Sequence, residues 1–232
     1  MHGHNHSLLS SVTIRQQLGR GIIIYPFNGA QLKTCSYDVR LGEWYFRRKN
    51  AAEMGIPFFN PYDEEMIKLH YGEPIRATLA VEEPSINLTH CRNIKPNNRA
   101  IILQPGEMIL GHTEEFVGGT KNPESGRCFT AEMKARSSIG RVGFEVCRCA
   151  GWGDVGYVNR WTMEIVCTSP LPTILVVGTR LAQMKFYEVD EVANSELYGA
   201  DNARDHYQSR TDWQDVVTSW NPKMLLPKLT TT

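Results

Sequence analysis

Short apolar runs separated by turn residues dominate the chain from residue 99 onward. In the run WTMEIVC every second side chain is large and apolar, which is the period of a β-strand with one buried face. That face carries Trp161, Met163, Ile165 and Cys167. Further apolar runs flank Gln104-Pro105-Gly106 and Gly178, which are turn signals. Many short strands at this spacing predict an all-β fold, either a barrel or a jelly-roll sandwich.

The first 46 residues predict one short helix and two strands. Apolar residues at helical spacing are Leu9, Val12, Ile14 and Leu18. Thr13 and Gln16 have the spacing of a capping box, and Gly19 ends the run. GIIIYPF reads as a strand stopped by Pro26, and SYDVRLGEWYF alternates like one strand. Residues 46–98 hold five prolines and mixed charge, which predicts a loop-rich insertion.

Length, charge and apolar content limit the possible functions of the chain more than its possible folds. The 232 residues fit a single domain spanning 1–232, with a C-terminal tail from about residue 191. The 25 basic and 25 acidic residues leave no basic excess, so we expect no nucleic-acid partner, and any anion site must be local. We find no apolar run of membrane-spanning length and no signal peptide, so we expect a cytoplasmic protein without a membrane partner.

The six cysteines contain no CxxC pair, which favours buried thiols over a disulfide framework or a metal site. Cys147 and Cys149 would share a face if residues 144–150 formed a strand. His112-Thr113-Glu114 matches the first half of the zinc-deaminase signature, but the P-C-x-x-C half is missing. We therefore expect no protein-bound metal.

The run RSSIGR gathers cationic and hydroxyl side chains in a chain without net charge. Its candidate ligand groups are Arg136, Ser137, Ser138 and Arg141. Arginine forks and serine hydroxyls are suited to phosphate oxygens, so the run could cradle an anion. The alternative is a polar turn between two strands, and the pattern alone leaves both open.

Two carboxylates stand at unusual positions. Glu164 lies in mid-strand between Met163 and Ile165, so it either faces water or is a partly buried general base. Asp154 lies between glycines in AGWGDVGY, where a loop could hold a carboxylate beside a ligand. Its alternative is an ordinary turn residue.

Taken in order, these stretches resemble the dCTP deaminase branch of the dUTPase superfamily. The resemblance runs through LLSSVTIRQQLGRGIIIYPF, SYDVRLG, LQPGEMILGHTEEFV, ARSSIGRVGFEV, AGWGDVGYVNRWTMEIV and TRLAQMKF. It covers roughly residues 8–45 and 99–190. It implies a distorted jelly roll that assembles as a homotrimer with active sites between subunits.

The resemblance also implies roles for individual residues. Glu164 would be the catalytic base, with Ser137, Arg141 and the Ala150 carbonyl fixing the water. The nucleotide would be bound by Arg136, Ser138, Asp154, Tyr157, Gln183, Tyr207 and Gln208. Mg²⁺ would arrive on the triphosphate of dCTP or dUTP. Two departures are Asn159 in place of glycine and His206 in place of lysine before Tyr207.

The implied reaction is hydrolytic deamination of dCTP to dUTP and ammonia, which the sequence favours. AGWGDVGY also suits a bifunctional deaminase and diphosphatase that yields dUMP. A plain dUTPase fits less well, because no glycine follows Gly199 and a glutamate occupies position 164. A non-enzymatic trimer that binds nucleotides is the last alternative.

Overall fold

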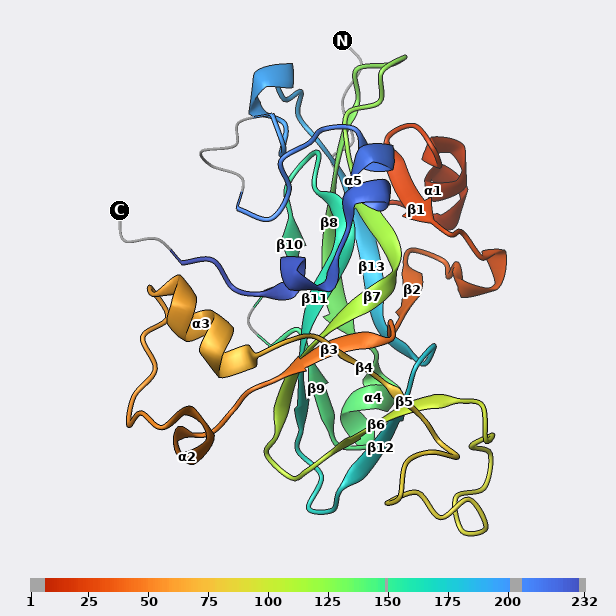
Figure 1. Ribbon diagram of the computed structural model, residues 1–232. Coiled ribbons are helices and arrows are strands. Elements are labelled where there is room, and N and C mark those ends of the chain that lie inside the picture. Colours follow the sequence, from red (N-terminus) through yellow and green to blue (C-terminus); the bar gives the residue numbers. More distant parts are fainter. Residues whose placement is uncertain (1–6, 149, 201–205, 230–232) are drawn as a thin grey trace.

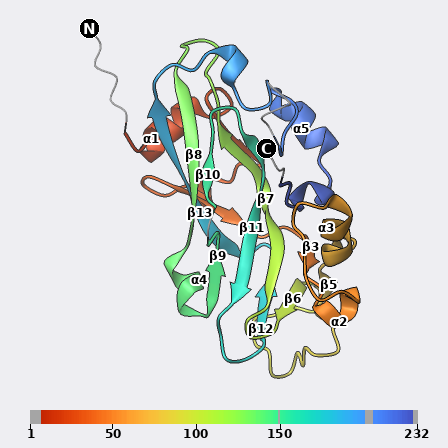
Figure 2. The same cartoon turned by 90° about the vertical axis from the view of Figure 1, so that its left-hand side faces the viewer.

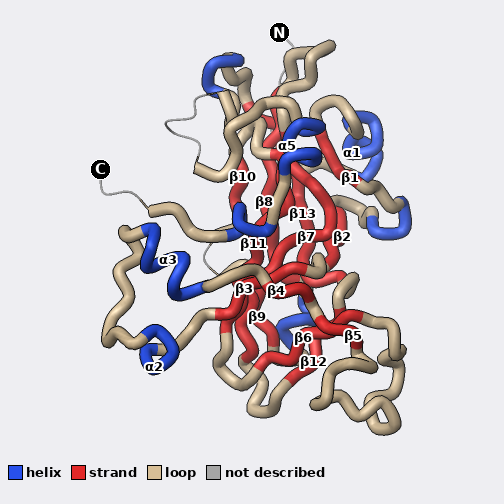
Figure 3. The backbone as a smooth tube through the Cα atoms, viewed as in Figure 1, coloured by secondary structure: helices blue, strands red, loops and turns tan. Residues whose placement is uncertain are grey.

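The computed structural model describes residues 7–148, 150–200 and 206–229 (Figure 1). The strands are β1 (Ile22–Tyr25), β2 (Tyr37–Arg40), β3 (Trp44–Arg47), β4 (Ile75–Arg76), β5 (Thr78–Leu79), β6 (Arg99–Leu103), β7 (Met108–Gly119), β8 (Cys128–Ala135), β9 (Phe144–Val146), β10 (Trp152–Gly153), β11 (Val158–Cys167), β12 (Thr173–Val176) and β13 (Arg180–Val189). The helices are α1 (Ser11–Gln17), α2 (Ala51–Met54), α3 (Glu64–Tyr71), α4 (Ser137–Arg141) and α5 (Trp213–Ser219), with short 3-10 turns η1 (Gly29–Gln31), η2 (Asn194–Glu196) and η3 (Pro222–Leu225). Figure 3 shows strands through the middle of the molecule and short helices around its periphery. The predicted mainly β architecture is confirmed.

Three sheets organise the strands. The six-stranded sheet has the order β4-β3-β7-β11-β9, and β1 also pairs with β7. The four-stranded sheet has the order β10-β8-β13-β2, and a small sheet joins β12, β6 and β5. The main core draws on both larger sheets, since Met133 and Met184 of one are buried with Ile109 and Met163 of the other.

The buried face predicted from the alternation in WTMEIVC is observed. Trp161, Met163, Ile165 and Cys167 are all buried in the main core. Glu164 faces the opposite side of β11, because successive side chains of a strand point to opposite faces. That side is covered by α3 and the tail rather than left wholly to solvent.

Several local predictions were wrong in detail. Helix α1 is capped by Ser10, whose hydroxyl accepts from the amide of Thr13, and not by a Thr13–Gln16 box. SYDVRLGEWYF forms two strands, because β2 pairs with β13 of one sheet and β3 pairs with β7 of the other. Between them Gly42 lies against the His112 ring, where a Cβ would come within 1.9 Å of a ring atom. The strand expected at 144–150 ends at Val146, since Cys147 adopts φ 57°, and Cys149 lies outside the described residues.

The segment 46–98 is more ordered than a loop-rich insertion. Asp63 caps α3 by accepting from the amides of Glu65 and Met66, and the helix ends at Gly72. Its inward face packs Ile67 and Tyr71 into a second apolar cluster with Phe46, Leu110 and Leu225. The proline content and mixed charge of the segment did not reveal this helix.

Figure 2 separates the peripheral elements onto two sides of the sheets. Helices α1 and α4 lie on one side, whereas α2, α3, α5 and the C-terminal segment lie on the other. Within the described ranges, we find no helix with the length and apolar content needed to cross a membrane.

Candidate active site

A cavity of about 380 Å³ opens where the two larger sheets diverge. Strand β11 pairs with β9 only from Ile165 to Cys167, whereas β10 pairs with β8 of the other sheet. Between these strands, Glu164, Ala150 and Asp154 all line the same cavity. Tyr71 and Leu225 line it as well, so segments far apart in sequence converge on the carboxylate that the strand pattern singled out.

Glu164 has the environment of a tuned acid–base group. Its side chain is half-buried, and its Oε2 atom is inaccessible to solvent without a hydrogen-bond partner in the described structure. Burial raises the pKa of the Glu164 carboxyl. A carboxylate in a cavity with a raised pKa is suited to accept a proton and to return it. The solvent-facing alternative for this residue does not describe the structure.

The turn after β9 brings Ala150 to the cavity. The amide of Cys147 donates a 3.2 Å hydrogen bond to the carbonyl oxygen of Glu164. The left-handed backbone conformation of Cys147 then turns the chain away from β11. Burial, together with the Glu164 charge, raises the pKa of the Cys147 thiol to about 12, so this cysteine stays neutral.

Asp154 and Tyr157 occupy the turn between β10 and β11. The amide of Tyr157 donates a 3.0 Å hydrogen bond to the Asp154 carbonyl, which leaves the exposed Asp154 side chain beside the cavity. The Tyr157 ring packs edge-on against Trp161, with 5.3 Å between ring centres. Burial raises the pKa of Tyr157, so its hydroxyl remains protonated.

Hydrogen bonds from Gln208 to the backbone anchor the tail, which keeps Tyr207 at the cavity. The Gln208 amide donates to the carbonyl of Gly156 at 2.9 Å and to that of Arg210 at 2.7 Å. Its oxygen accepts from the amide of Val158 at 3.1 Å. In this conformation the buried Gln208 is engaged with backbone, whereas Tyr207 lines the cavity.

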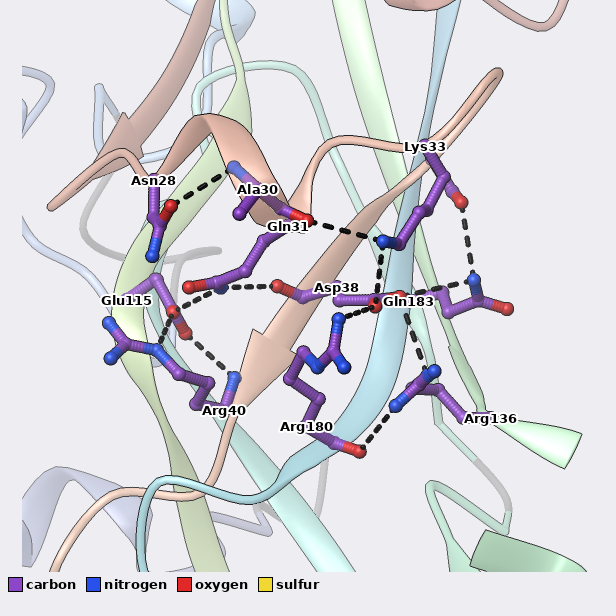
Figure 4. A network of polar contacts seen from close by, with 11 residues as sticks. Asn28, Ala30, Gln31, Lys33, Asp38, Arg40, Glu115, Arg136, Arg180 and Gln183 are labelled. Carbon is purple, nitrogen blue, oxygen red and sulfur yellow. Dashed lines mark hydrogen bonds and ion pairs between the residues drawn. The ribbon is translucent and has the colours of Figure 1, made fainter. Parts of the chain in front are cut away.

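The remaining predicted nucleotide contacts lie elsewhere. Arg136 and Gln183 belong to a network around Asp38, which is fully buried (Figure 4). Asp38 is 3.5 Å from Arg136 Nε and 3.2 Å from Arg180 Nη1, and Gln183 Nε2 donates to it at 3.2 Å. Lys33 Nζ adds a longer ion pair at 3.9 Å. Three cations thus surround one carboxylate, leaving positive charge for an anion.

RSSIGR forms the start and body of α4 rather than a simple turn between strands. Ser137, Ser138 and Arg141 are exposed, and no side-chain hydrogen bond is formed by them within the described part of the chain. They do not line the cavity of Glu164. Helix α4 lies on the opposite side of the sheets from α3 and the tail (Figure 2).

Comparison with known proteins identifies the family. The family model described as dCTP deaminase-like matches residues 8–189. The chain belongs to the dCTP deaminase-like family. It is 28% identical over 182 residues to a "dCTP deaminase, dUMP-forming" of Clostridium acetobutylicum, covering 78% of this chain and 83% of that one. A protein of the same description from Methanobrevibacter smithii is 30% identical, with coverage of 78% and 79%.

The fold of this dCTP deaminase-like chain has a solved counterpart. The crystal structure of 2'-deoxycytidine 5'-triphosphate deaminase from Agrobacterium tumefaciens aligns with a TM-score of 0.53 at 17% identity. The alignment covers 82% of this chain, which spans half the length of that solved chain. This likeness supports the dUTPase-like fold expected from the sequence.

Two segments that line the cavity were not predicted from the sequence. Tyr71 comes from α3, and Leu225 and Pro227 come from the tail. Tyr71 lies within the residues that the family model matches, whereas Leu225 and Pro227 lie beyond them. A usable signal was present, since Asp63, Ile67 and Tyr71 have the cap and i, i+4 spacing of an amphipathic helix.

The HTE match is also explained by packing. His112 is fully buried, its Nδ1 is 2.8 Å from the Thr113 carbonyl, and its Nε2 accepts from the amide of Trp44. Burial lowers the pKa of His112 to about 4. Among the described residues, His, Cys, Asp and Glu side chains form no group of three or more that could hold a metal.

Proposed function

We propose that this protein is a bifunctional enzyme that converts dCTP to dUMP, ammonia and pyrophosphate. The observation that carries the proposal is the placement of Glu164 and Asp154 in one cavity, with a buried Glu164 oxygen that lacks a partner. The relatives described as dUMP-forming support the second activity. They weigh against the simpler release of dUTP that the sequence alone favoured.

For deamination, Glu164 takes a proton from a water molecule that attacks C4 of the cytosine. The resulting tetrahedral carbon expels the amino group, and Glu164 returns the proton to the departing ammonia. Ala150 lines the same cavity, and its backbone carbonyl could orient the water by accepting its second hydrogen. The raised pKa of Glu164 suits a group that must both accept and donate.

For diphosphate removal, a second water attacks the α-phosphorus and pyrophosphate leaves. Asp154 is the second acidic side chain lining the cavity, and a carboxylate can orient this water. Mg²⁺ would enter with the triphosphate, which it binds through phosphate oxygens.

The residues of RSSIGR, which the resemblance assigns to the phosphates and to the water, are proposed to come from a neighbouring copy together with Gln183. Arg136, Ser137, Ser138, Arg141 and Gln183 do not line the cavity of their own chain. Helix α4 lies on the opposite side of the sheets from α3, which contributes Tyr71 to the cavity wall (Figure 2). A homotrimer with sites between subunits would bring the two halves together.

The deciding experiment is product analysis. The purified chain is incubated with dCTP and Mg²⁺, and ammonia, dUTP, dUMP and pyrophosphate are separated and quantified. Equal amounts of ammonia, dUMP and pyrophosphate are expected. Accumulation of dUTP without pyrophosphate would identify a monofunctional deaminase, and absence of ammonia would remove the deaminase assignment.

A further inference from the structure

Tyr71 places a phenol hydroxyl in the cavity that contains Glu164. The residue is only 8% exposed, and it lines the cavity. No hydrogen bond to its hydroxyl is formed within the described part of the chain. The hydroxyl is therefore free to donate a hydrogen bond to a ligand.

The position of the Tyr71 ring is fixed from several directions. The ring of Phe46 meets it edge-on at 6.3 Å between centres, and that of His70 at 5.0 Å. Ile67 and Leu225 complete the surrounding apolar cluster. A ring held in this way aims its hydroxyl in one direction, which is what a recognition group requires.

The tail and the insertion support each other around this ring. Leu225 of η3 packs into the same cluster, and Lys223 forms a 3.0 Å ion pair with Glu73, two residues after Tyr71. The part of the cavity wall that carries Tyr71 is therefore built from the 46–98 segment and the C-terminal tail together.

Electrostatics keep Tyr71 a donor. Burial raises the pKa of its hydroxyl, and the Glu164 charge acts in the same direction, whereas Arg48 opposes them. Tyr71 thus stays protonated at neutral pH beside an acceptor, the Glu164 carboxylate. The two groups are not bonded to each other in this structure, so both are available to a ligand.

A neighbouring donor and acceptor match one edge of cytosine. The exocyclic amine of cytosine donates and the adjacent N3 accepts, whereas uracil has the reverse arrangement at O4 and N3. We propose that Tyr71 is a base-recognition residue that donates a hydrogen bond to N3 of cytosine while ionised Glu164 accepts from the exocyclic amine. This inference rests on the proposed function and names the feature that would select cytosine over uracil at the first step.

The test compares Tyr71→Phe, which removes only the hydroxyl, with Tyr62→Phe as a matched control. Tyr62 belongs to the same insertion but is 59% exposed and does not line the cavity. With dCTP and Mg²⁺, Tyr71→Phe should raise KM about tenfold and change kcat less, because one hydrogen bond to the ground-state base is lost. Tyr62→Phe should match the wild type.

A binding measurement separates this inference from the proposed function. Dissociation constants for dCTP and dUTP are measured in EDTA on Glu164→Gln, with and without Tyr71→Phe. The preference for dCTP should fall about tenfold when the hydroxyl is removed. An unchanged preference, or equal weakening of both nucleotides, would show that Tyr71 only packs the wall. Failure of the wild type to release ammonia would instead reject the deaminase, and the binding ratio would still test Tyr71.

Discussion

The amide of Cys147 donates a 3.2 Å hydrogen bond to the carbonyl of Glu164, so strand β11 fixes where the neighbouring turn begins. Cys147 is one of two non-glycine residues with positive φ among those described. Strained backbone of this kind persists where surrounding contacts enforce it. Here it starts the turn that carries Ala150 to the cavity, which ties the position of the carbonyl to that of the carboxylate.

Glu164→Gln should abolish ammonia release while dCTP still binds. The amide has the shape of the carboxyl group but cannot accept the proton of the attacking water. Ammonia release is measured in stopped assays, and dCTP binding is measured by calorimetry. Turnover at the wild-type rate would exclude Glu164 from the mechanism.

The same substitution should stabilise the fold at neutral pH. The folded pKa of Glu164 lies above its unfolded value, so the folded state holds more protons between the two pKa values and loses stability as pH rises through them. The glutamine side chain does not titrate, so the variant does not lose this stability as pH rises. Urea unfolding should therefore show Glu164→Gln gaining stability relative to the wild type from acidic to neutral pH, and a constant difference would contradict the assigned burial effect.

Asp154→Asn should stop pyrophosphate formation and slow deamination less. Asp154 shares the cavity with Glu164, yet only the second step needs a carboxylate near the sugar and α-phosphate. Chromatography of the products should then show dUTP in place of dUMP. Unaltered dUMP production would leave Asp154 as a turn residue.

Arg136→Ala should weaken dCTP binding more than deoxycytidine binding. Charge-assisted contacts to phosphate contribute about 1.5–3 kcal/mol each, and deoxycytidine cannot make them. Asp38 would still be paired with Arg180, so the fold should survive. Arg20→Ala, which removes an exposed ion pair with Glu124, is the control. Equal losses for both ligands would assign Arg136 a structural role.

Sedimentation should show a particle of about three times the 26.3 kDa chain mass. Mixing Glu164→Gln and Arg136→Ala chains before assembly should restore part of the activity, because some sites would then combine an intact Glu164 from one copy with an intact Arg136 from another. An active monomer, or mixed assemblies without any recovery, would contradict a site shared between subunits.

Acid should destabilise the protein through His112. Its pKa is lowered to about 4, below the unfolded value, so its contribution is complete above the unfolded pKa and is lost as pH falls toward 4. His112→Gln retains a donor and an acceptor without titrating. Between pH 7 and pH 5 the wild type should lose about 2 kcal/mol more in urea unfolding than this variant. The exposed His90→Gln should follow the wild type, and parallel curves for His112→Gln would disprove the effect.

The sequence alone determined the strand content, the buried face of β11 and the isolation of Glu164 on its other face. These features depend on a two-residue period that is local to each strand, so they can be read without knowing which strands pair. The resemblance to the family, which rests on the order and spacing of several motifs, implied roles for residues of RSSIGR and AGWGDVGY.

Only the tertiary structure decided what surrounds Glu164. Tyr71 and Leu225 are more than 150 positions apart along the chain, and they meet because α3 and η3 pack in one cluster with Phe46 of β3 and Leu110 of β7. The separation of Arg136 from the Glu164 cavity is likewise set by sheet pairing. Long-range packing of this kind depends on how apolar surfaces fit together, which the local periodicity of a sequence does not specify.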